Sequence, residues 1–257
     1  MTSPLVAMVL EARNVVAALR QKQVARLGPV AVSGMLAEQL AKELSTGAKP
    51  GAVVVGGDPR AVRAPVAVRI VAGDPTEEDD SFVRATEKAE IPIVIVQLWP
   101  QENWRGPFVL SPFVVECKTG EGFPLAKIAG QIATAAEDPT ALAARIPVLK
   151  QTVERSVRRD AIVRSALLAA GASGKRAARS PLMLEQVGVV SRLRALEDTE
   201  RRGEEQMPIV AGTAAVAIAA SYGFRELGRL ARRRLPDPLA DAAVAAAGTW
   251  EVAEIFR

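Results

Sequence analysis

Hydrophobic residues in the first half of the chain alternate between short apolar runs and stretches with helical spacing. The apolar runs have the length of strands and lie at residues 30–34, 52–55, 66–72, 91–98 and 112–117. Helical spacing is found at residues 5–27, 35–44, 77–89 and 124–136. The run at residues 91–98 is apolar on both faces, as expected for a central strand of a parallel sheet. This alternation predicts an α/β fold with a mainly parallel sheet and flanking helices.

The pattern changes after residue 139, because strand-like runs are almost absent from there to the end. The predicted helices of this part lie at residues 140–157, 159–171, 181–198, 206–221, 223–234 and 238–254. The sequence therefore predicts two domains. The first is an α/β domain over residues 1–138, which includes the amino-terminal helix, and the second is an all-helical domain over residues 139–257.

The most apolar helical stretch lies at residues 208–224. It is short for a membrane span and consists mostly of small residues, which insert weakly. We interpret it as a buried helix and leave membrane association open. The amino-terminal segment has no positively charged region before its apolar residues, so it does not resemble a signal peptide. These patterns favour a cytoplasmic protein, with association at a membrane surface as the alternative.

The residue composition argues against several kinds of catalytic chemistry. The chain has no histidine, and its one cysteine is Cys117. Histidine is the commonest general base and metal ligand, and a cysteine nucleophile normally needs it as a partner. A lone cysteine also forms no internal disulfide. We therefore predict a buried, inert Cys117, no catalytic residue, and neither a metal nor a cofactor.

Residues 66–137 carry a recognisable order of motifs. A strand ending in VAGD is followed by an acidic helix, the strand IPIVIVQLW, the strand SPFVVECKTGEG and another helix. This order resembles the back half of an Era-like bacterial GTPase. In that family the second of these strands ends in the guanine-reading Asn-Lys-x-Asp, and the third ends in Ser-Ala-Lys-Thr-Gly-Glu-Gly. The resemblance implies a fold like that of P-loop nucleotide hydrolases.

The motifs that would hold the nucleotide are missing. The guanine-reading motif is replaced by Gln97-Leu98-Trp99-Pro100, which has no aspartate, and only Lys118 remains of Ser-Ala-Lys. The phosphate loop G-x-x-x-x-G-K-[ST] would fall at residues 33–38. There the chain has Gly34 alone, no lysine, and Glu38, which would repel phosphate. The resemblance therefore implies a degenerate, pseudo-GTPase domain.

A few residues remain as weak candidates for binding a nucleotide or another anion. They are Gly34, Gly56, Gly57, Lys118 and Thr119. Glycine turns can present backbone N–H groups to an anion, but a plain tight turn explains Gly56 and Gly57 as well. The carboxylates at residues 77–80 could hold a hard cation, and they also suit the first turn of a helix, which is the preferred interpretation.

The helical tail resembles a second bacterial family. Its motifs are SPLMLEQ at residues 180–186, YGFRELGRLAR at residues 222–232, Leu235-Pro236, and AGTW at residues 247–250. They are similar to the uncharacterised helical domain, of the YcjF-like family, that accompanies bacterial GTPase modules. Parts of that family are membrane-associated, so the resemblance implies a membrane surface as one partner.

Arginines near the end of the chain form a predicted basic face. Helical spacing places Arg225, Arg229 and Arg232 on one side, and Arg233 and Arg234 extend it. Such a face would bind an acidic protein, anionic lipid or nucleic acid, while pairing with nearby acids is the alternative. Because aromatic residues are only 4% of the chain, base stacking and hence nucleic acid are disfavoured.

Together these patterns predict a non-catalytic, GTPase-like regulatory or scaffolding protein. It would bind a protein partner or a membrane surface through its helical domain, and self-association is left open. One alternative is a nucleotide- or anion-binding protein with a non-standard site at the glycines and Lys118. The other is a peripheral membrane adaptor that uses the arginine face.

Overall fold

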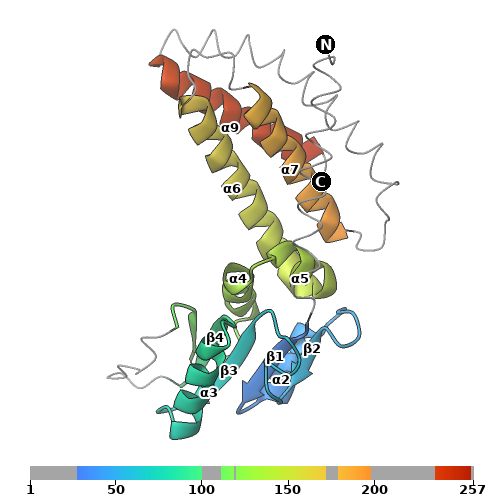
Figure 1. Ribbon diagram of the computed structural model, residues 1–257, viewed down its shortest axis with the longest axis vertical. Helices are drawn as coiled ribbons and strands as arrows, with labels where there is room; N and C mark the ends of the chain where they lie inside the picture. The colour runs from blue at the N-terminus through green and yellow to red at the C-terminus, as the bar shows by residue number, and fades with distance from the viewer. Residues whose placement is uncertain (1–27, 100–110, 119, 172–178, 198–234, 256–257) are drawn as a thin grey trace. The chain divides into compact units, whose positions relative to one another are not determined.

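The computed structural model describes residues 28–99, 111–118, 120–171, 179–197 and 235–255 (Figure 1). The predicted helices at residues 5–27, 206–221 and 223–234, the arginine face and Thr119 lie outside the described residues. The described residues fall into two units, residues 28–153 and residues 154–255, and each unit is described by itself.

A five-stranded sheet in the order β2-β1-β3-β4-β5 forms the first unit (Figure 1). Its strands are β1 (Val30–Gly34), β2 (Val53–Val55), β3 (Ala67–Ala72), β4 (Ile93–Leu98) and β5 (Val114–Cys117). Every pairing between neighbouring strands is parallel. Residues of β3 and β4 are buried almost throughout, as their continuous apolar character predicts. The predicted parallel α/β fold is confirmed.

Three amphipathic helices pack on this sheet. They are α2 (Ala37–Leu44), α3 (Glu77–Lys88) and α4 (Leu125–Ala135). Helix α2 contacts β1 and β2, α3 contacts β3 and β4, and α4 contacts β4 and β5. Under α3, Val83 and Phe82 pack against Ala67, Ile93 and Ile95. The apolar residues of α3 therefore cover this part of the sheet.

Two short helices complete the first unit, α5 (Pro139–Arg145) and the 3-10 helix η1 (Pro147–Leu149), and both contact α4. The carboxylate of Asp138 caps α5 by accepting a hydrogen bond from the N–H of Ala141 at 3.0 Å. The prediction of one helix over residues 140–157 was wrong. The chain breaks at residues 146–149, because Pro147 has no N–H with which to continue α5.

The described part of the second unit consists of α6 (Lys150–Gly171) from residue 154 onward, α7 (Arg179–Glu197) and α9 (Asp237–Ile255). Helix α6 runs without a break through residue 158, where the sequence predicted a boundary. Helix α7 packs on α9. Between α9 and α6, the Thr249 hydroxyl donates a hydrogen bond to the Ser165 hydroxyl at 2.8 Å, and both side chains are buried. None of the described helices is long and apolar enough to cross a membrane.

Candidate functional site

The carboxyl ends of the parallel strands form one edge of the sheet, and the described nucleotide-binding candidates all lie on it. Gly34 ends β1, Gly56 and Gly57 follow β2, and Lys118 follows β5. The Gly56 N–H donates a hydrogen bond to the Val32 carbonyl oxygen at 2.8 Å, so the glycines of β1 and β2 are neighbours. Lys118 is separated from Gly34 by β3 and β4, about 14 Å at the usual strand spacing.

Doubly wound parallel sheets bind their ligands at this edge, where the strand order reverses. In the order β2-β1-β3-β4-β5 the reversal lies between β1 and β3. The turn that leaves β1 is therefore the first place to look for a site.

The turn from β1 to α2 is too short to form a phosphate loop. Only Met35 and Leu36 lie between the end of β1 and the start of α2, whereas G-x-x-x-x-G-K-[ST] must wrap around the phosphates. Leu36 is the N-cap residue, and its side chain caps no backbone N–H. Glu38 follows in the first turn of α2, where its carboxylate opposes the binding of another anion. This turn lacks the length and the charge for phosphate.

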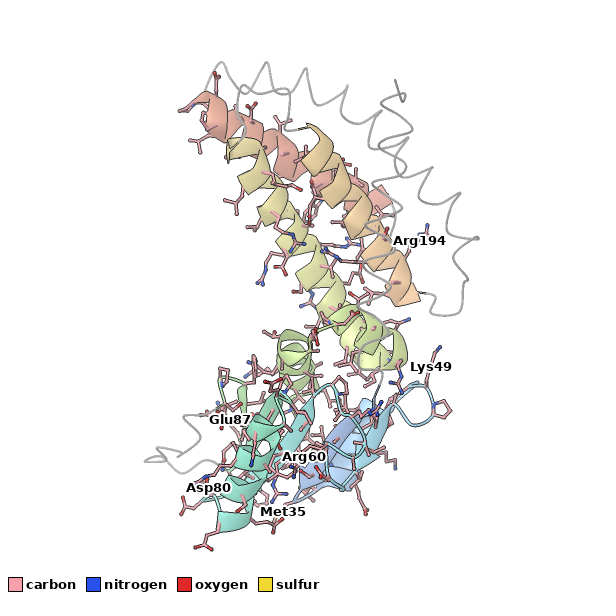
Figure 2. The ribbon with its side chains drawn as sticks, viewed as in Figure 1. Met35, Lys49, Arg60, Asp80, Glu87 and Arg194 are labelled. Atoms are coloured by element: carbon pink, nitrogen blue, oxygen red, sulfur yellow. The ribbon has the colours of Figure 1, made fainter. Side chains whose placement is uncertain are left out.

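The same edge presents large apolar side chains to solvent. Met35 is 53% exposed, Leu36 and Trp99 are each 45% exposed, and Val55 is 47% exposed. Figure 2 shows Met35 and Asp80 at one end of the unit and Lys49 toward the other. Leu36 and Trp99 also have positive φ, which costs about 1–2 kcal/mol in a residue other than glycine. An edge with this character suits apolar contact better than phosphate.

The turn at Gly56 and Gly57 is held by its own residues. Both glycines have positive φ and face open space. The Asp58 carboxylate accepts hydrogen bonds from the Arg60 backbone N–H at 3.0 Å and from its Nε at 3.2 Å. The backbone hydrogen bond from Arg60 lowers the pKa of Asp58, although desolvation opposes the shift. A carboxylate that stays ionised beside these glycines disfavours an anion, and the tight-turn interpretation is preferred.

Gln97 stands where the resemblance places the guanine-reading asparagine, and its role in the structure is to join two strand ends. The side chain is fully buried, and its Nε2 donates a hydrogen bond to the Gly73 carbonyl oxygen at 2.6 Å. Its Oε1 has no hydrogen-bond partner among the described residues. A side chain buried in this way cannot reach a base at the surface.

We expect Gln97→Glu to lower the free energy of unfolding by about 1–3 kcal/mol at neutral pH, because it replaces a buried donor with a carboxylate facing the Gly73 carbonyl. Urea denaturation measures the change. Gln97→Met is the matched control, since it removes the donor without adding a charge, and it should cost less. Equal stability of Gln97→Glu and the wild type would contradict this role.

The acidic residues at positions 77–80 form the first turn of α3, as the preferred interpretation predicted. Asp79 Oδ2 accepts hydrogen bonds from the Thr76 N–H at 2.9 Å and the Thr76 hydroxyl at 2.8 Å, which makes a capping box. Asp79 Oδ1 accepts one from Arg69 Nε at 2.7 Å, and both side chains are buried. Within the described ranges, no group of three histidine, cysteine or acidic side chains could hold a metal ion.

Two opposing effects act on the pKa of Asp79. Desolvation raises the pKa of Asp79, but hydrogen bonds from Thr76 and Arg69 outweigh it and hold the pKa below its usual value. The Arg69 guanidinium also lies over the Phe82 ring, 5.1 Å from its centroid. Sequence reasoning missed Arg69, although a single charge inside an apolar strand was a visible signal. The ion pair between Arg69 and Asp79 joins β3 to α3.

Cys117 is buried at the end of β5, as predicted. Burial raises the pKa of its thiol, although the charge of Lys127 opposes the shift. A thiol with a raised pKa carries less of the reactive thiolate at neutral pH.

Helix α9 exposes several apolar residues in the described second unit. Its exposed apolar residues include Leu239, Ala243, Ala247 and Trp250, which we call the α9 face. Every charged residue of α9 is acidic, namely Asp237, Asp241, Glu251 and Glu254. The predicted arginine face lies outside the described residues.

No protein-family model matches this chain, and comparisons with curated proteins and with solved structures found no match. The two family resemblances therefore rest on the sequence motifs alone.

Proposed function

We propose that this is a non-catalytic, GTPase-like regulatory or scaffolding protein that acts by binding another protein through its helical domain. The observation that carries the proposal is the turn after β1. Met35, Leu36 and Glu38 occupy the position at which a related nucleotide hydrolase would grip phosphate. The parallel sheet is retained, while the edge that would bind the ligand is apolar and acidic.

The chemistry of α9 supports a protein partner over a membrane. Anionic lipid surfaces attract basic residues, whereas the charges on α9 are all acidic. An exposed tryptophan beside small apolar residues is typical of the centre of a protein interface. The α9 face therefore favours a protein partner with basic residues around an apolar centre.

We expect calorimetry to detect no binding of GTP with Mg²⁺ tighter than about 1 mM, because the chain offers no phosphate loop and no aspartate for the base. Thermal melts of the wild type and of Lys118→Ala with and without GTP test the non-standard site. Neither should shift. A tight, Mg²⁺-dependent titration, or a GTP-induced stabilisation that Lys118→Ala abolishes, would overturn the proposal.

A further inference from the structure

Helix α6 exposes a row of residues at every fourth position. Arg155, Arg159, Val163 and Leu167 are exposed, and we call this row the α6 stripe. Residues four apart share one side of a helix. The opposite side of α6 is buried and consists of Val153, Val157, Ala161 and Ser165. The α6 stripe thus faces away from the core of its unit, with a basic end and an apolar end.

Helix α9 exposes a row with the same spacing. Leu239, Ala243, Ala247 and Glu251 are exposed, and we call this row the α9 stripe; Trp250 lies beside it. The opposite side, with Ala245, Thr249 and Val252, is buried. The α9 stripe also faces away from the core, with an apolar end and an acidic end.

The two stripes are complementary when the helices run antiparallel. Arg155 then meets Glu251, Arg159 meets Ala247, Val163 meets Ala243, and Leu167 meets Leu239. Within the described residues, neither Arg155 nor Glu251 takes part in an ion pair. The alanines let a second helix approach closely. The Arg159 stem is long enough to lie over Ala247.

We propose that the α6 stripe of one copy of the chain docks antiparallel on the α9 stripe of a second copy. This inference rests on the proposed function, and it identifies the protein partner as a second copy of the chain. Both stripes are exposed on their own helices, and the basic end of one matches the acidic end of the other. The interface joins two different surfaces, so it is head-to-tail and leaves one stripe free at each end. Association therefore continues beyond a dimer unless a ring closes.

Charge reversal tests the pairing in the full-length protein. Sedimentation velocity from about 1 μM to about 300 μM should show an average mass that rises with concentration. Arg155→Glu and Glu251→Arg should each weaken association about tenfold or more, because each places like charges opposite one another. An equimolar mixture of the two variants should restore association, since the reversed charges then face each other.

Arg84→Glu is the matched control, because it makes the same charge change at an exposed position of α3 and should leave association unchanged. Circular dichroism melts confirm that the variants are folded. A wild type that stays monomeric throughout, an association that neither reversal weakens, or a mixture that stays dissociated would each overturn the inference. If the protein is monomeric and binds no GTP, this inference fails and the proposed function stands. If it binds GTP tightly, the proposed function fails, whatever its oligomeric state.

Discussion

Replacing Asp79 with alanine should lower the free energy of unfolding by about 3–5 kcal/mol, because it leaves the buried Arg69 guanidinium without its main partner. The same change removes the acceptor of the Thr76 capping box. Glu78 still contacts Arg69 Nη2 at 3.1 Å, but it is 82% exposed and stabilises the charge only weakly. Urea denaturation measures the loss.

Asp80→Ala is the matched control for this prediction. Asp80 is in the same helical turn and is less buried than Asp79, so its loss should cost less than about 1 kcal/mol through the helix dipole. The coupling between partners is tested with Arg69→Met. The double variant Arg69→Met/Asp79→Ala should lose less than the sum of the single losses, because no unpaired charge stays buried. Strictly additive losses would show that Arg69 and Asp79 do not interact.

The same pair makes stability depend on pH. The pKa of Asp79 in the folded protein lies below the ordinary value of 3.8. Its contribution is therefore complete above pH 3.8 and is lost as the pH falls through the folded pKa. The stability difference between the wild type and Asp79→Ala should narrow below that pH. A difference that stays constant into the acid range would mean that the carboxylate charge does not stabilise the fold.

The elements of the sheet unit could be predicted because burial leaves a local pattern. Continuous apolar runs marked β3 and β4, and helical spacing marked α2, α3 and α4. The break between α5 and α6 was missed, because apolar spacing continues across residues 146–149, while a single proline decides where the helix ends. Periodicity reports which side of an element is buried better than it reports where the element stops.

Pairings across the fold could not be predicted in this way. Arg69 and Asp79 belong to different elements, and only packing of α3 on β3 brings them within 2.7 Å. Gln97 likewise meets Gly73 only because β3 and β4 pair in register. At the candidate site, the residues that form the turn after β1 could be read from the sequence. The shortness of the turn needed the observed end of β1 and start of α2.

Gly34→Ala should destabilise the protein by more than about 4 kcal/mol. A Cβ at this position would lie 2.0 Å from the Ile70 carbonyl oxygen. That oxygen belongs to β3, which pairs with β1 in the register Gly34↔Ile70, so it cannot move without disturbing the sheet. Gly34 also has φ +99°, a conformation that alanine rarely adopts.

Gly51→Ala separates the clash from the backbone strain. Gly51 has φ +70°, and a Cβ added there would meet no heavy atom within 4 Å, so alanine should cost only about 1–2 kcal/mol. Urea denaturation measures the free energy of unfolding of both variants. Equal losses of stability would show that the close approach of Ile70 does not add to the cost of alanine at Gly34. The result bears on the site, because Gly34 lies where the family resemblance places the start of a phosphate loop. A loss explained by the Ile70 contact makes Gly34 a requirement of the sheet, independent of any bound anion.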